Sequence, residues 1–150
     1  MTQRPDNRAE PLRASVASGR RSAAGFVSVP WVSEQLRRLL GCDPFPGTLN
    51  VQLRDPHSLA AWRRHRSGGD GLALPAADPG FCDSSYFPVL LNGTVRCGIV
   101  LPHVPGYPHD VVELVAGVSL RDRLGLNDGD VVSIELTAAH APAGGTDAAT

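Results

Sequence analysis

The 150-residue sequence contains no lysine, and all fourteen of its basic residues are arginines. This absence excludes the Walker A phosphate loop, the strand lysine of protein kinases and any Schiff-base catalyst. A chain of this composition that handles phosphate must therefore use backbone N–H groups, arginine side chains and a metal ion.

The sequence also lacks several other features that mark particular classes of protein. It has no apolar run as long as a membrane span, and its N-terminus lacks the apolar segment of a signal peptide, so we expect a cytoplasmic protein. The net charge of −1 gives no basic excess for nucleic acid, and we expect a monomer with no membrane partner. The three cysteines are far apart and form no CxxC pair, which excludes a zinc motif and a disulfide framework, so we expect three free thiols that behave as small apolar residues.

The chain reads as one domain between two polar or small-residue ends. Residues 1–13 and 137–150 are expected to be disordered, which leaves a folded domain at 14–136. Apolar periodicity predicts helices at 30–40, 55–66 and 119–125, and Asn92-Gly93 predicts a hairpin. Six short strands are predicted at 26–29, 48–53, 86–91, 94–101, 111–117 and 130–136. Many short strands with two or three short helices indicate a mainly-β fold, a compact six-stranded barrel.

The segment PFPGTLNV, residues 44–51, places two polar side chains on one face of a strand. The strand period of two puts Thr48 and Asn50 on the same side, with Cα atoms about 7 Å apart. A hydroxyl and an amide carbonyl at that spacing can converge on a hard cation such as Mg²⁺. The same alternation is also common on a solvated strand face, and the pattern alone favours that simpler interpretation.

Two further segments allow a functional and a plain interpretation. Glu113 lies within the apolar strand VVELVA, where desolvation tends to raise a carboxyl pKa and suits it to proton transfer, unless the strand is an edge that turns Glu113 to solvent. The loop SGRRSAAG, residues 18–25, can wrap a phosphate through its N–H groups with help from Arg20 or Arg21, although most such loops are ordinary surface loops.

Together these segments resemble one family. PFPGTLNVQL, the Asn-Gly hairpin and the block VVELVAGVSLRDRLGLNDGDVVSIEL occur in the order found in the CTP-dependent riboflavin kinases of archaea, and the likeness runs from about residue 18 to 136. The resemblance implies a cradle-loop (RIFT-type) β-barrel. It also implies transfer of the γ-phosphate of CTP to the 5′-hydroxyl of riboflavin with Mg²⁺, which yields FMN and CDP.

The resemblance also implies roles for particular residues. Thr48 and Asn50 correspond to the family's magnesium ligands, and Glu113 corresponds to the glutamate beside the ribityl chain of the flavin, where it orients or deprotonates the attacking hydroxyl. The nucleotide-binding positions fall on Gly19, Arg20, Arg21, Ser22, Ala23, Ala24, Val118, Ser119, Leu120 and Arg121.

The sequence departs from the family in the first loop. The repeated glycines of the family become Arg21 and Ala23, and no threonine corresponds to the one expected in the loop before Glu113. A non-glycine residue at positive φ costs about 1 kcal/mol or more. Either the loop has another shape and uses arginine, with CTP or another nucleoside triphosphate as donor, or the chain is a non-catalytic relative that binds a flavin or nucleotide. A DNA-binding barrel is disfavoured by the net charge and the absence of lysine.

Overall fold

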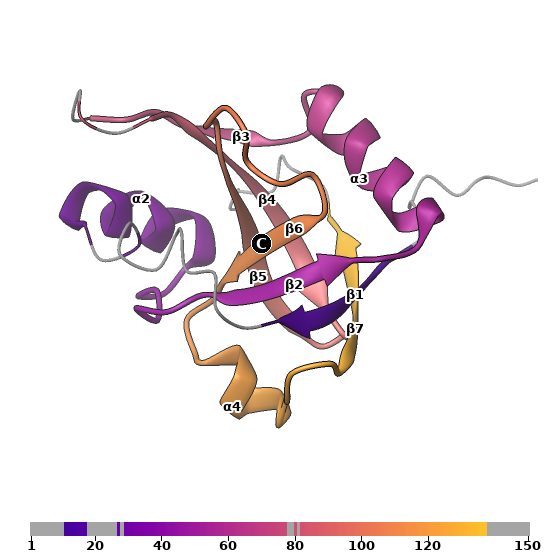
Figure 1. Cartoon of the computed structure of the whole chain (residues 1–150). Helices are drawn as coiled ribbons and strands as arrows, with labels where there is room; N and C mark the ends of the chain where they lie inside the picture. The colour runs from indigo at the N-terminus through magenta and orange to yellow at the C-terminus, as the bar shows by residue number, and fades with distance from the viewer. Residues whose placement is uncertain (1–10, 18–26, 28, 78–79, 81, 138–150) are drawn as a thin grey trace, which may run out of the picture.

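The computed structural model describes residues 11–17, 27, 29–77, 80 and 82–137. Within these residues a single antiparallel sheet has the strand order β3-β4-β5-β6-β2-β1-β7, and an additional pairing of β4 with β7 closes it (Figure 1). The strands are β1 (Leu12–Ala17), β2 (Leu49–Leu53), β3 (Leu72–Leu74), β4 (Ser84–Leu91), β5 (Val95–Pro102), β6 (Val111–Val115) and β7 (Val131–Leu136).

The closed part of the sheet is a barrel of six strands, with β3 as a short addition at the edge of β4. β4 makes this possible because it changes partner along its length: Tyr86 pairs with Leu72 of β3, whereas Val89 pairs with Leu136 of β7. The expected mainly-β, six-stranded barrel is therefore confirmed.

The interior of the barrel is filled by the inward-facing residues of every closed strand. Along β2 these are Leu49, Val51 and Leu53, each less than 5% exposed. Helix α3 (Pro56–Ser67) adds Trp62, whose ring meets the ring of Phe87 edge to face at a centroid distance of 4.9 Å. An aromatic pair of this kind typically adds about 1 kcal/mol to the free energy of burial. The alternate residues of each strand consequently point outward.

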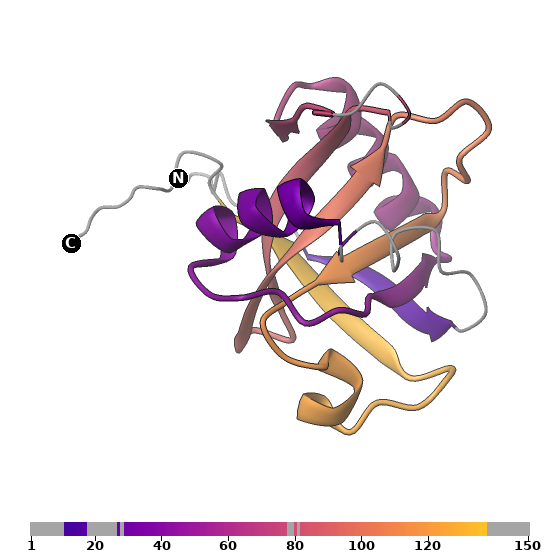
Figure 2. The ribbon, with the colours of Figure 1, turned by 90° about the vertical axis from the view of Figure 1, so that its left-hand side faces the viewer.

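A second apolar cluster covers part of the outer face of the barrel. Helix α2 (Pro30–Leu40) lies across this face and buries Val32 and Leu36 against Tyr86, Val100 and Val115 of the sheet (Figure 2). Tyr86, Val100 and Val115 on the outer face of β4, β5 and β6 are therefore shielded from water as fully as residues inside the barrel.

Local signals in the sequence correctly predicted the helices and the hairpin. α2, α3 and α4 (Leu120–Leu124) begin and end within two residues of the predicted ranges. Asp55 caps α3 by accepting the Ser58 N–H at 2.9 Å. Asn92 and Gly93 both have positive φ, and the Thr94 N–H donates to the Leu91 carbonyl at 3.0 Å, which is the expected hairpin turn.

Three strand assignments differ from the prediction. The predicted strand at 26–29 is wrong, because Val27 has helical backbone and Val29 is the N-cap of α2, whose first residue is Pro30. The sixth strand of the barrel is instead β1, which starts at Leu12, two residues before the expected start of the domain. β3 lies in the range 67–79, where only a loop was expected.

The described residues bear on two expectations, one about membrane-spanning segments and one about the three cysteines. No helix there is both long enough and apolar enough to cross a membrane. All three cysteines are free: Cys97 is buried, Cys82 is half-buried, and Cys42 is exposed. Cys42 therefore differs from the expected small apolar core residue.

Candidate active site

The centre of the candidate site is a cross-strand pair on the outer face of the barrel. Asn50 of β2 stands directly opposite Glu113 of β6. Because the neighbours of Asn50 along β2 fill the barrel interior, its own side chain points outward, and the same alternation applies to Glu113 between Val112 and Leu114. Asn50 is 6% exposed and Glu113 is 0% exposed.

This pair belongs to a row of residues that are in register across six strands. Starting from β1 the row consists of Ala17, Asn50, Glu113, Val100, Tyr86 and Leu72. An amide and a carboxylate therefore occupy the middle of an otherwise mostly apolar, largely buried surface. Polar groups in such a position interact strongly with one another and with any ligand, because little water screens them.

Thr48 adds a third polar group next to this pair. Its Oγ1 lies 3.4 Å from Asn50 Oδ1, so the two oxygens converge as the strand period predicts. A backbone hydrogen bond holds the turn that leads into β2. The Phe45 N–H donates to the carbonyl of Ala116, just after β6, over 2.7 Å. The start of β2 and the end of β6 are thus joined by the ladder between the two strands and by this additional hydrogen bond.

The oxygens of Thr48 and Asn50 suit Mg²⁺ by chemistry and by separation. Neighbouring ligands in a magnesium octahedron are about 2.9 Å apart, so a separation of 3.4 Å is within a small side-chain adjustment. Among the described residues no group of three or more His, Cys, Asp or Glu side chains can hold a metal ion. The Thr48 hydroxyl and the Asn50 carbonyl are neutral oxygens, which suit an ion that also takes phosphate oxygens and water.

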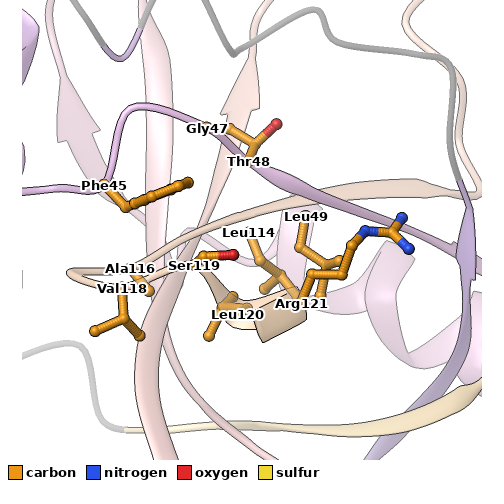
Figure 3. Close-up of a pocket in the computed structure, with 10 residues that line it drawn as sticks. All are labelled: Phe45, Gly47, Thr48, Leu49, Leu114, Ala116, Val118, Ser119, Leu120 and Arg121. Carbon is orange, nitrogen blue, oxygen red and sulfur yellow. The ribbon is translucent and has the colours of Figure 1, made fainter. Parts of the chain in front are cut away.

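A pocket of about 120 Å³ opens beside Thr48 (Figure 3). Its ten lining residues come from two parts of the chain, the turn that leads into β2 and the segment from the end of β6 into α4. Thr48 lies on one side, and Ser119, Leu120 and Arg121 lie on the other. The pocket brings a predicted metal ligand next to the predicted nucleotide-binding segment.

Arg121 supplies the positive charge of this pocket. Its Nη2 lies 2.9 Å from Oδ1 of Asp128 in the turn before β7, and both side chains are partly exposed. The Ser119 hydroxyl accepts the Asp122 N–H at 3.3 Å and so caps α4. The α4 end of the pocket is therefore held by one ion pair and one helix cap.

The structure brings together most of the residues that the sequence singled out. Thr48 and the segment 118–121 line one pocket, while Asn50 and Glu113 lie beside it in the adjoining strands and do not line it. The predicted phosphate loop, Gly19–Ala24, lies outside the described residues. Sequence reasoning did not single out Phe45 as a pocket residue; its position between two prolines was the only available signal.

Comparison with known proteins gives the family. The family model for CTP-dependent riboflavin kinases, which carries the description "Domain of unknown function DUF120", matches residues 16–136. The chain belongs to the CTP-dependent riboflavin kinase family. The match starts within β1 and ends with β7, so the family's domain contains almost all of the barrel and every described site residue.

Curated relatives in this family are named riboflavin kinase. The chain is 39% identical over 136 residues to the protein of Methanoculleus marisnigri, a match that covers 89% of this chain and 60% of the relative. It is 40% identical over 127 residues to the protein of Aeropyrum pernix, covering 83% and 94%. The protein of Methanothermobacter thermautotrophicus is 37% identical over 119 residues, covering 79% and 93%. The chain thus spans about three fifths of some riboflavin kinases and nearly all of others.

Proposed function

We propose that this chain is a riboflavin kinase that transfers the γ-phosphate of CTP to the 5′-hydroxyl of riboflavin in the presence of Mg²⁺. One observation carries the proposal: Asn50, with the Thr48 hydroxyl 3.4 Å away, stands directly opposite the buried Glu113. A candidate cation-binding pair and a candidate proton acceptor are therefore adjacent. The names of the relatives support riboflavin as the acceptor, and the name of the family supports CTP as the donor.

The phosphate side of the reaction uses Thr48, Asn50 and Arg121. Thr48 and Asn50 would hold Mg²⁺, which when bound neutralises charge on the transferring phosphates. Arg121 borders the same pocket and offers charged N–H donors to a phosphate oxygen. This division of roles requires no lysine, in agreement with the composition of the chain.

The acceptor side uses Glu113. Its carboxylate would accept a hydrogen bond from the riboflavin 5′-hydroxyl and take up the proton as the new O–P bond forms. The bond from the γ-phosphorus to the β–γ bridging oxygen breaks in the same transfer, and CDP leaves. Since Glu113 has no exposed surface in the structure, riboflavin must displace a covering group before it reaches the carboxylate.

The nucleotide would lie against Val118, Ser119, Leu120 and Arg121, with its phosphates also near the loop Gly19–Ala24. Because that loop carries Arg21 and Ala23 where the family has glycines, the choice of donor is the part of the proposal that most needs a direct measurement.

The decisive experiment incubates the purified chain with riboflavin, Mg²⁺ and each of the four nucleoside triphosphates, and separates FMN from riboflavin by chromatography. FMN is expected with CTP. Asn50→Ala should abolish its formation, whereas Asn127→Ala, which removes an exposed amide that lines no part of the pocket, should not. If no donor gives FMN, the proposal is wrong.

A second candidate is a non-catalytic relative that binds a flavin or a nucleotide. The substitutions at Arg21 and Ala23 favour it, because side chains there restrict a close backbone approach to phosphate. Calorimetry distinguishes the two candidates. Binding of riboflavin or CTP without formation of FMN supports the second, and any turnover excludes it.

A further inference from the structure

The pocket beside Thr48 has an apolar end that metal and phosphate binding do not explain. Four large apolar side chains are exposed among the described residues: Phe45, Val104, Val118 and Val131. Two of the four, Phe45 and Val118, line this one pocket, although 73 positions separate them in the chain. Exposed apolar side chains that gather in a pocket indicate a ligand surface, whereas scattered ones need no explanation.

Phe45 is held in place although the residue is 39% exposed. Its N–H is bonded to the Ala116 carbonyl, and prolines on both sides fix the backbone dihedral φ of the turn. Its ring lies close above Gly47, where a Cβ atom would be only 3.2 Å from Cε2. A preorganised aromatic ring binds a flat ligand with little loss of conformational entropy.

The size of the pocket suits a single flat ring. Its volume of about 120 Å³ is close to the roughly 150 Å³ of an engineered apolar cavity in another protein that binds benzene. The apolar side chains of Phe45 and Val118 lie at one end of the pocket, and the Arg121 guanidinium extends at the other (Figure 3). Apolar walls at one end suit the base, and the cation at the other end would face the phosphates where they extend out of the pocket.

We propose that Phe45 is the stacking surface for the single-ring base of the donor nucleotide, with Val118 on the other side of the base. This inference rests on the proposed function for the identity of the ligand. It adds a base-binding residue in the turn that also carries Thr48, so that one short segment contacts both ends of the nucleotide.

The test compares Phe45→Ala and Phe45→Tyr with the unmodified chain in calorimetric titrations of CMP, CTP and inorganic triphosphate, each with Mg²⁺. Stacking of a base on an aromatic ring predicts that Phe45→Ala weakens CMP and CTP binding by about tenfold or more. Inorganic triphosphate, which has no base, should bind both proteins equally. Phe45→Tyr, which keeps the ring, should bind all three probes as the unmodified chain does.

Two controls separate stacking from structural damage. Val104→Ala removes an exposed apolar side chain outside this pocket and should change nothing. Phe45→Leu keeps an apolar side chain without the aromatic face; it should retain the thermal unfolding midpoint and still weaken CMP binding. Unchanged CMP and CTP affinity in Phe45→Ala overturns the inference, as does an equal loss for inorganic triphosphate. If Phe45→Ala does not fold, Phe45→Leu decides by the same criteria.

Failure of the inference about Phe45 can be distinguished from failure of the proposed kinase function. If the unmodified chain binds CTP but forms no FMN, the kinase proposal fails while the effect of Phe45 on binding is still measured. If FMN forms and Phe45→Ala has the unmodified KM for CTP, the inference about Phe45 fails while the kinase proposal stands. Absence of both CTP binding and FMN formation overturns both.

Discussion

Asn50 and Glu113 are held opposite each other by the ladder between β2 and β6, not by flexible loops. Both strands are continuous members of the closed barrel, with β1 beside β2 and β5 beside β6. The separation of the amide and the carboxylate is consequently set by backbone hydrogen bonds on both sides of the pair. Side chains positioned in this way keep their geometry when a substrate arrives, which is what the proposed role of Glu113 as a proton acceptor requires.

Glu113→Gln should remove proton acceptance while it keeps the size and polarity of the side chain. Loss of a general base typically lowers kcat by about 10²- to 10⁴-fold, and we expect a loss of that order with a much smaller change in the KM for riboflavin. Steady-state measurement of FMN formation provides the test. Glu34→Gln, on the exposed face of α2, is the matched control. An unchanged kcat in Glu113→Gln would remove this residue from the chemistry.

Thr48→Val should raise the Mg²⁺ concentration needed for half-maximal FMN formation. The substitution keeps the shape of the side chain and removes the oxygen that lies 3.4 Å from Asn50 Oδ1. Loss of groups that only support metal ligands costs about 10- to 100-fold in affinity, so loss of a ligand should cost at least as much. Thr48→Ser restores the oxygen and should restore the Mg²⁺ dependence, and chelation with EDTA should stop the reaction in every variant. Identical Mg²⁺ curves for Thr48→Val and the unmodified chain would exclude Thr48 as a ligand.

Gly98→Ala should destabilise the fold through one specific contact. A Cβ atom at Gly98 would lie 2.1 Å from Cε1 of Tyr86, whose ring is buried beneath α2. Overpacking of this kind typically costs about 1–3 kcal/mol, measured as a lower free energy of unfolding in urea. In a Tyr86→Ala background the same substitution should cost clearly less, because the ring that it meets has gone. Equal costs in the two backgrounds would show that the contact with Tyr86 is not the cause.

The free energy of unfolding should decrease in alkaline solution because of Cys97. Burial raises the pKa of its thiol from 9.0 to about 12, so from pH 9 upward the unfolded chain loses this proton while the folded chain keeps it. Stability is therefore complete below pH 9 and falls by about 1.4 kcal/mol per pH unit towards pH 12. Burial also raises the pKa of Tyr86, which adds to the slope above pH 10. Since the chain has no lysine, the amines that usually titrate in this range are absent.

Urea unfolding at pH 8, 9, 10 and 11 measures this slope. Cys97→Ala should flatten the part that begins at pH 9, and Val104→Ala, which removes an exposed side chain that does not titrate, should leave the slope unchanged. Parallel pH profiles for Cys97→Ala and the unmodified chain would contradict the assignment.

The parts of the fold that the sequence predicts well are those with local causes. Pro30 and Gly41 bound α2, Asp55 caps α3, and Asn92-Gly93 forms its turn with positive φ, all within a few residues. β1 was missed because its inward residues include the small Ala14, and its stability comes from pairing with β2 and β7, which lie far away in the sequence. The residues at 26–29 favour a strand by propensity, but the helix that starts at Pro30 takes precedence over that preference.

In the site, too, the features with local causes were predicted from the sequence and those set by distant parts of the chain were not. The period of two correctly placed Thr48 and Asn50 on one side of a strand, but pattern alone could not show that Asn50 faces Glu113, because register between strands 63 positions apart is set by the whole barrel. The resemblance to the riboflavin kinases supplied that link. The exposure of Phe45 is likewise a property of the folded chain, and its position between two prolines does not reveal it.

The closure of the barrel by β7 has a consequence for how the protein is made. Among the described strands β7 comes last in the chain, yet its partners are β1, which comes first, and β4. During synthesis both of those strands keep an unpaired edge until the final residues of β7 emerge, and such edges readily recruit other chains. Completion of the barrel must therefore wait for the synthesis of β7. Until then, the unpaired edges of β1 and β4 are the parts of the sheet at which aggregation is expected to start.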